Sequence, residues 1–234
     1  NSTIPIGNFL VNANNSPSIL LKNNLQVMGN ATFNGNGSNV FNTQNYNLLL
    51  NADITNNFGS NDGFNNSTGR VIFNGNTDQN IGGSQNTTFN ILQLDKTAGR
   101  VEVNTNARVN GSIRFISNSI LDVNTNKITM AAGTRIYSDD GITYQFDTFS
   151  DSMCVVVQNT SQLVGGSLEF ELNPSQTLPY EIHYPITTEG VYTPMKIRLL
   201  PSGVTYGTNP KINVREYAGE HPKVEVPNVS LKKY

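Results

Sequence analysis

The chain has 234 residues, a formal net charge of −2 and only 14% charged residues, so it shows no electrostatic footprint for nucleic acid. Hydrophobic residues make up 36%, which is enough for a narrow core, and no apolar run approaches the roughly 20 residues that span a bilayer. The single cysteine excludes an internal disulfide framework. Because the chain opens on Asn1, without an initiator Met or a targeting segment, we expect it to be part of a longer protein.

Asparagine dominates the first part of the chain. Of 36 asparagines, 31 precede Met130. Asparagine tolerates left-handed backbone conformations and hydrogen-bonds its own turn, so this part must turn often. Between the turns, alternation such as Arg100-Val101-Glu102-Val103 has the period of a strand. The sequence predicts an all-β fold, and the regular recurrence of Val, Ile, Leu and Phe argues against the alternative of disorder.

An internal repeat predicts the architecture. Residues 9–43 align with residues 91–125 at a shift of about 82, and the alignment pairs Val27 with Val109, Phe33 with Phe115 and Gly29 with Gly111. Such self-similarity is typical of stacked structural units, and at roughly 20 residues per turn the shift would hold about four rungs. We therefore predict an Asn-rich β-solenoid, similar to a parallel β-helix, over residues 1–165, with a meandering antiparallel stack as the second interpretation.

The repeat also places individual residues. We expect the side chains at positions 27, 33, 109 and 115 to point into the core, with Phe33 and Phe115 at like positions in separate rungs. Gly29 and Gly111 should lie at equivalent corners, where a side chain would clash or the φ angle is positive.

The amino-acid composition and the length of the expected strands change after Met130. Asparagine becomes scarce, proline becomes common, and strands lengthen, as at Met195 to Leu200. Alternation punctuated by Pro and Gly is typical of antiparallel sandwiches. The sequence predicts a small β-sandwich-like module over residues 166–234.

Candidate catalytic and metal-binding residues do not form a pattern. Glycoside hydrolysis needs paired carboxylates about 5 to 10 Å apart, and the acidic residues of the solenoid half are scattered: Asp53, Asp62, Asp78, Asp95, Glu102 and Asp122. Asp139 and Asp140, with Asp147 and Asp151 downstream, lack the spacing of a calcium loop and are more typical of a turn.

The remaining reactive residues are isolated. Alternation puts His183 on the same side of a strand as Glu181, and His221 has no second ligand at metal-binding spacing. Cys154 lies in an apolar run, which favours a small buried residue over a nucleophile. The tyrosines of the second half fit the rim of a sandwich core better than a sugar-stacking surface. We expect no catalytic, cofactor-binding or metal-binding residue and no cofactor.

Several stretches carry a resemblance to a known family: Gly69 to Asn76, Gln79 to Gly83, Thr88 to Leu92, Val101 to Gly111, Tyr184-Pro185-Ile186 with Gly190 to Pro194, and Leu231 to Tyr234. They resemble the repeats, and the module that follows them, in large Bacteroidota surface proteins exported by the type 9 secretion system, including SprB-like gliding-motility adhesins. Thr193 departs from the arginine often found there. Asp151-Ser152-Met153 is similar to the O-glycosylation signal of such exported proteins. The resemblance implies an extracellular cell-surface protein and offers no catalytic residues.

These observations lead to the hypothesis of a non-enzymatic structural or adhesive segment, a stalk or filament module of a secreted cell-surface protein. Its partners would be other repeats of the same polypeptide, surface polysaccharide or other cell-surface proteins, with no nucleic acid and no membrane span. The alternative is a carbohydrate-binding or carbohydrate-active β-helix module. A third hypothesis, ice binding, requires a regular array such as recurrent Thr-x-Thr, which the sequence lacks.

Overall fold

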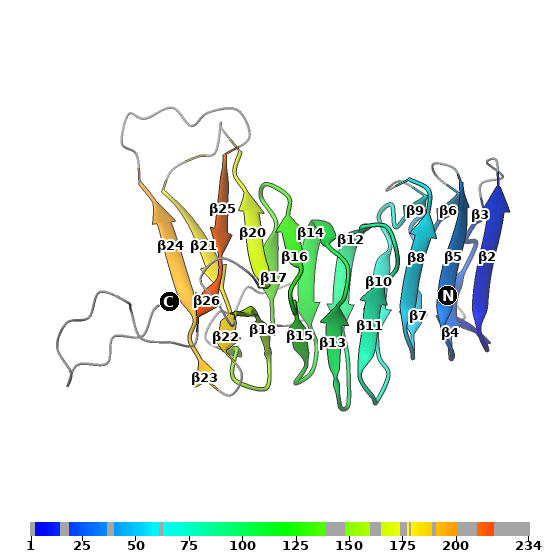
Figure 1. Ribbon diagram of the computed structural model, residues 1–234, viewed down its shortest axis with the longest axis horizontal. Coiled ribbons are helices and arrows are strands. Elements are labelled where there is room, and N and C mark those ends of the chain that lie inside the picture. Colours follow the sequence, from blue (N-terminus) through cyan, green and yellow to red (C-terminus); the bar gives the residue numbers. More distant parts are fainter. Residues whose placement is uncertain are drawn as a thin grey trace.

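The computed structural model describes residues 3–14, 19–36, 40–60, 63–138, 148–159, 165–173, 177, 179–188, 191–200 and 210–217. These residues form short strands that stack side by side along one long axis, with the amino-terminal strands at one end and the carboxy-terminal strands at the other (Figure 1). Almost all strand pairing is parallel, so the predicted all-β fold with a β-solenoid is confirmed.

Each coil of the solenoid contributes strands to three faces, which we call faces A, B and C. Face A contains β1 (Thr3–Ile6), β4 (Asn24–Val27), β7 (Leu48–Leu50), β10 (Arg70–Phe73) and β17 (Arg135–Tyr137). Face B contains β2 (Phe9–Asn14), β5 (Ala31–Asn36), β8 (Ile54–Phe58), β11 (Gln79–Gly82), β13 (Arg100–Val103), β15 (Ile120–Asp122), β18 (Cys154–Val156) and β22 (Ile186–Thr188). Face C contains β3 (Ile19–Leu20), β6 (Phe41–Asn42), β9 (Phe64–Asn65), β16 (Lys127–Met130) and β20 (Ser167–Glu171).

Two long strands bend from face C onto face A. β12 (Thr87–Leu94) and β14 (Ala107–Phe115) pair in parallel, and their register shifts between Phe89 and Ile91. This irregularity lets one strand serve two faces, as β-bulges commonly do. β12 and β14 therefore join the strands of face A to the later strands of face C, β16 and β20, in a single ten-stranded sheet, whereas β3, β6 and β9 form a separate three-stranded sheet.

The register gives the length of one coil. Along face A, Leu25 pairs with Leu48, Leu48 with Val71, and Val71 with Leu92. These steps are slightly longer than the roughly 20 residues per turn expected from known repeat periods. The shift that aligns Phe33 with Phe115 is therefore not a whole number of coils, and it moves the chain onto a different face.

The predicted equivalences fail for this reason, although the predicted burial is correct. Val27, Phe33, Val109 and Phe115 are all fully buried. Phe33, however, belongs to β5 on face B, whereas Phe115 ends β14 on face A. The two phenylalanines do not occupy like positions, because strands on all three faces bury alternate side chains and the sequence pattern does not distinguish one face from another.

Gly29 and Gly111, which the repeat also pairs, likewise lie at different places in the coil. Gly29 lies between β4 and β5, at the corner from face A to face B, and a Cβ there would come within 2.0 Å of Asn8 Oδ1. Gly111 lies in the bend of β14, where a Cβ would come within 2.7 Å of the Asn90 carbonyl oxygen. Both glycines are needed for close approach between coils, but at different corners.

The core is a column of apolar side chains enclosed by the three faces. Alternation sends every second residue inward, as in β8, where Ile54, Asn56 and Phe58 are buried. Phenylalanine rings stack from coil to coil: the ring of Phe33 has its centroid 5.0 Å from those of Phe41 and Phe64, and Phe64 contacts Phe89 at 6.3 Å. Such pairs add to the stabilisation that area burial provides.

The predicted small antiparallel module is present at the carboxy-terminal end. β25 (Lys211–Val214) runs antiparallel to β20, β24 (Met195–Leu199) to β21 (Tyr180–Tyr184), and β23 (Val191–Tyr192) to β22. A short parallel pair, β19 (Gln158–Asn159) and β26 (Glu216–Tyr217), completes this end. Parallel pairing continues past residue 165, since β20 extends β16 and β22 extends β18. The module is thus built onto the last coils.

Candidate functional site

The corners of the solenoid are bonded by side-chain amides. At the corner from face A to face B, Asn8 Oδ1 accepts a hydrogen bond from the backbone N–H of Asn30 at 2.9 Å. Asn30 Oδ1 in turn accepts from the N–H of Asp53 at 3.4 Å, and Asp53 Oδ1 from the N–H of Asn80 at 2.8 Å. A corner interrupts the backbone ladder, so these N–H groups take a side-chain oxygen as acceptor in place of a backbone carbonyl. The side chain of one coil therefore satisfies the backbone of the next.

The other corners use the same device. Asn24 Oδ1 accepts from the N–H of Asn47 at 3.0 Å where the chain enters face A, and Asn106 Oδ1 accepts from the N–H of Lys127 at 2.9 Å where it enters face C. Asn24 and Asn106 lie 82 residues apart, so the alignment of residues 9–43 with 91–125 also pairs them, and each accepts a backbone N–H at a different corner. The abundance of asparagine thus has a structural cause.

Amide side chains also bond to one another across the outer side of face B. Asn57 Nδ2 donates to Asn34 Oδ1 at 3.0 Å. Further along the axis, Asn104 Nδ2 donates to Asn80 Oδ1 at 2.7 Å and Asn124 Nδ2 donates to Asn104 Oδ1 at 3.1 Å. These ladders run parallel to the axis, so they resist separation of the coils without adding charge.

One buried lysine side chain bonds from its own coil to the preceding coil. Lys96 is only 1% exposed, and its Nζ donates to the carbonyl oxygens of Gly75 and Thr77 and to Gln79 Oε1, at 3.0, 2.8 and 2.7 Å. Burial lowers the pKa of Lys96 to about 8, against a smaller opposing effect of Asp78. The three N–H donors of the ammonium group thus meet three oxygen acceptors, and these bonds link the corner before β11 to the next coil. Its seclusion from solvent excludes a nucleophilic role towards an external substrate.

The densest ionic contacts lie on the outer side of face C, where the antiparallel strand joins. Arg108 on β14 makes two hydrogen bonds to Glu171 on β20, at 2.8 and 2.7 Å. Lys211 on β25 bonds to Glu169 at 3.1 Å and approaches Glu171 at 3.4 Å. Lys127 reaches Glu169 at 3.3 Å. This network, which we call the face C ion network, fastens β25 to the last parallel strands.

The network shifts the ionisation of its carboxylates. The hydrogen bonds from Arg108, acting against burial, lower the pKa of Glu171 to about 2. Burial opposes ionisation of Glu169, but the hydrogen bonds from Lys211 and Lys127 outweigh it and lower the pKa of that carboxyl below its ordinary value. Both carboxylates are engaged with cations at neutral pH, so neither is suited to act as a general acid.

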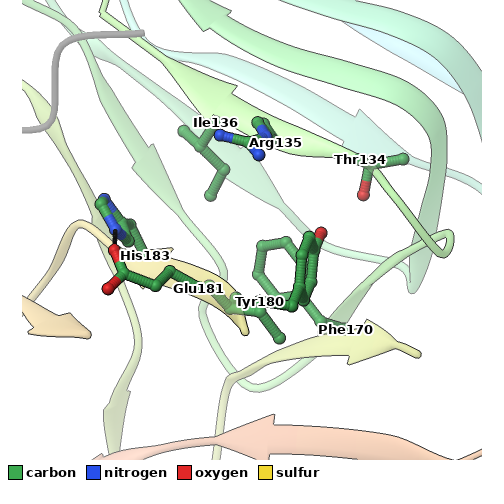
Figure 2. A pocket seen from close by; sticks show the side chains of 8 residues that line it. Thr134, Arg135, Ile136, Phe170, Tyr180, Glu181 and His183 are labelled. Carbon is green, nitrogen blue, oxygen red and sulfur yellow. Dashed lines mark hydrogen bonds and ion pairs between the residues drawn. The ribbon is translucent and has the colours of Figure 1, made fainter. Parts of the chain in front are cut away.

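A hollow lies between β17, β20 and β21 and is lined by Thr134, Arg135, Ile136, Phe170, Tyr180, Glu181, Ile182 and His183 (Figure 2). Its empty space of about 220 Å³ includes open solvent at the mouth, so the hollow is a shallow depression and not an enclosed ligand pocket. His183 Nε2 and Glu181 Oε2 are 3.3 Å apart at its rim. The prediction that these two side chains share one side of the strand is confirmed.

The chemistry of the hollow is modest. Burial lowers the pKa of His183, with the hydrogen bond to Glu181 acting in the opposite direction. Glu181 also lies 3.6 Å from Lys196 and 3.7 Å from Arg198. One carboxylate shared among a histidine and two cations is an ordinary ion cluster on a sheet surface, without the second carboxylate that glycoside hydrolysis requires.

The other residues weighed from sequence are dispersed. Cys154 is fully buried, as predicted, and its thiol lies 3.5 Å from the carbonyl oxygen of Asp151. Asp53 and Asp78 each accept a backbone N–H from the next coil, and Asp122 pairs with Arg100 at 2.9 Å. Several sequence candidates fall outside the described residues: Asp62, Asp139, Asp140, Asp147 and His221.

The described residues lack a metal site and a membrane-spanning helix. They contain no cluster of three or more His, Cys, Asp or Glu side chains arranged to hold a metal ion. Within the same ranges, no helix has the length and apolar character needed to cross a membrane. Comparison of the chain with models of protein families, with curated proteins and with solved structures finds no match.

Proposed function

We propose that the chain is a non-enzymatic structural segment, a stiff stalk or filament module of a secreted cell-surface protein. The observation that supports this most is the continuous parallel stacking of strands along faces A and B, reinforced at the corners by side chains that bond to the next coil. A solenoid of this kind stabilises each coil through its neighbours. Bending would have to break hydrogen bonds on at least one face.

The outer surface of the first coils fits a spacer. Strands β1 to β9 contain no charged residue, and their outward positions are largely Asn and Thr. Such a surface stays hydrated without attracting one particular charged partner. The extracellular location rests on the resemblance of the repeats to exported Bacteroidota surface proteins, and the partners of the segment would be further repeats, surface polysaccharide or other cell-surface proteins.

Stiffness is the property that tests the proposal. Spin labels at Leu10→Cys on β2 and Lys196→Cys on β24 would report the distance between the two ends by double electron–electron resonance. The native Cys154 is fully buried and should not take up label. We expect a narrow distance distribution, as narrow as that of a control pair at Leu10→Cys and Met28→Cys, which lie on adjacent coils. A distribution much broader than the control would refute a stiff stalk.

The alternative, a carbohydrate-binding or carbohydrate-active module, has one observation in its favour: polar side chains converge on the hollow at Arg135, Tyr180 and Glu181. A glycan array together with a hydrolase assay separates the two functions. Specific glycan binding that is lost in Tyr180→Ala, with an unchanged melting temperature, would favour the alternative.

A further inference from the structure

The bend of β14 contains an asparagine–glycine pair that the strands on both sides pass over. Towards β12, the partners of Val109 and Ser112 are only two positions apart, so Asn110 and Gly111 together face the single residue Asn90. On the other side, pairing with β16 stops at Val109 and pairing with β17 begins at Ser112. Such a β-bulge leaves the extra residue outside the ladder. The peptide groups of this pair are therefore less constrained than those of a regular strand.

The Asn110 side chain is exposed, and a cation polarises its carbonyl group. Arg108 Nε donates to Asn110 Oδ1 at 2.8 Å, while the other nitrogens of the guanidinium bond to Glu171. A cation that donates to a carbonyl oxygen stabilises the negative charge that develops on this oxygen when a nucleophile adds to the carbon. The next backbone nitrogen in the chain belongs to Gly111, which has no Cβ to shield it. The bend thus places an activated side-chain amide beside an unhindered peptide nitrogen.

Two other asparagine–glycine pairs, at 34–35 and 74–75, are held differently. Gly75 is buried, and its N–H donates to Gln79 Oε1 at 2.9 Å. Gly35 lies within β5, which is paired in continuous register with β2 on one side and β8 on the other. The hydrogen bond and the ladders fix these two peptide groups, whereas that of Gly111 lies in the bulge.

We propose that Asn110 is a site of spontaneous deamidation, selected by the bulge and by Arg108. The Gly111 nitrogen loses its proton to solvent and attacks Cγ of Asn110, and the new C–N bond closes a succinimide ring. The Cγ–Nδ2 bond breaks, and the nitrogen leaves as ammonia with a proton taken from water. Water then opens the ring at either carbonyl carbon, which gives an aspartyl or an isoaspartyl residue. No oxidation or reduction takes place, and the inference does not depend on the stalk function.

The product changes the charge beside the face C ion network. A carboxylate at position 110 replaces a neutral amide on the guanidinium of Arg108 and competes with Glu171 for it. Hydrogen bonds from Arg108, together with those from Lys211, lower the pKa of Glu171 against the opposing effect of burial. A second carboxylate nearby should therefore raise the pKa of Glu171 towards its ordinary value. Deamidation of Asn110 would thus add a negative charge to this network as the protein ages.

Peptide mapping of the folded full chain tests the site. Trypsin releases residues 109–114 as one peptide, separate from those that contain Asn34 and Asn74. During incubation at mildly alkaline pH, exchange of the amide for a carboxyl group should raise the mass of this peptide, at a rate at least tenfold that at the other two asparagines. Isoaspartyl methyltransferase should add labelled methyl groups to the same peptide. The chain unfolded in urea is the matched control, because the three pairs should then react at similar rates.

Two variants test the chemistry and its consequence. Asn110→Gln keeps an amide for Arg108 but must close a larger ring, so the peptide should stay unmodified. Asn110→Asp carries the charge of the aspartyl product, and NMR titration should give Glu171 a higher pKa in this variant than in the parent. Deamidation at Asn110 no faster than at Asn34 and Asn74, or an equal preference for Asn110 in urea, would overturn the proposal. An unchanged pKa of Glu171 in Asn110→Asp would overturn the effect on the network.

Discussion

Two adjacent glycines at the end of β11 on face B, Gly82 within the strand and Gly83 just after it, provide a direct test of how the coils stack. Gly83 has a φ of +121°, and a Cβ there would lie 2.1 Å from the carbonyl oxygen of Asn56 and 2.6 Å from its backbone nitrogen, in the coil below. At Gly82, a Cβ would have no atom within 4 Å, and the φ angle lies outside the left-handed region. The two positions therefore differ in what the neighbouring coil and the backbone allow.

The expected effects of Gly83→Ala and Gly82→Ala have opposite signs. A strained φ costs about 1–3 kcal/mol, and overpacking against backbone costs about 1–3 kcal/mol more. Together these penalties should lower the free energy of unfolding of Gly83→Ala by about 3 kcal/mol or more. The added Cβ would also displace the Asn56 carbonyl, which accepts a hydrogen bond from the N–H of Gln85 at 3.0 Å. Gly82→Ala should raise stability by about 0.4–1 kcal/mol, because alanine restricts the unfolded chain.

Urea unfolding followed by far-ultraviolet circular dichroism measures both variants, since the chain has no tryptophan to serve as a fluorescent probe. The slope of the free energy against urea concentration should stay the same, and only the midpoint should move. Equal midpoints for the two variants, or a lower midpoint for Gly82→Ala than for Gly83→Ala, would show that the coils do not stack as described.

Four further predictions concern the core and the charges. Phe33→Ala should cost about 3–5 kcal/mol in urea unfolding, because the ring is fully buried among other rings. The pKa of Glu171 is about 2 when folded and 4.5 ordinarily, so the protein should lose about 2 kcal/mol as the pH falls from 4.5 towards 2, and Glu171→Gln should remove most of that dependence. Lys96→Met should destabilise the fold by about 3 kcal/mol, because it leaves carbonyl oxygens without a donor. The pKa of Lys96 is about 8 in the folded protein and 10.5 ordinarily, so between these two pH values the unfolded chain binds more protons than the folded one. The free energy of unfolding should therefore rise from pH 8 to 10.5 in the parent protein, and this rise should be absent in Lys96→Met. Val103→Pro should abolish cooperative melting, because it removes a backbone donor within β13, while His183→Ala should leave the melting temperature within a few degrees of the parent.

The fold class was predictable because the relevant signals are local. Alternation at Arg100 to Val103 marks a half-buried strand, and frequent Asn and Gly mark the turns between strands. Burial at Val27 and Phe115 followed from the same alternation. The parallel arrangement was indicated by the repeat, since stacked units bury a continuous core.

The assignment of strands to faces was not predictable. A strand on face A and a strand on face C obey the same rule of alternate burial, so the alignment of Val27 with Val109 matches two strands of different faces. Only the backbone pairing between strands shows to which face each strand belongs. The irregular register between Phe89 and Ile91, which bends β12, has no clear signal in the sequence.

Contacts between residues far apart in the chain also could not be predicted from the sequence. Arg108 and Glu171 are 63 residues apart, and Lys96 reaches Gln79 across the step between two coils. Charged residues at such separations have no periodicity to reveal them. The hollow at His183 is similar, because Arg135 comes from β17, far earlier in the chain, and adjoins His183 only in the stack.

The change in composition after Met130 corresponds to a change in how coils are held together. In the first part, amides such as Asn30 and Asn57 bond one coil to the next, and neutral hydrogen bonds of this kind are little affected by salt. In the last part, the face C ion network fastens an antiparallel strand, β25, onto β20. Ion pairs at half-exposed positions weaken with salt and with acid. The attachment of β25 therefore depends on ionic conditions, whereas the first coils, whose strands β1 to β9 carry no charged residue, are bonded mainly by amides and should keep their shape where the surrounding medium varies.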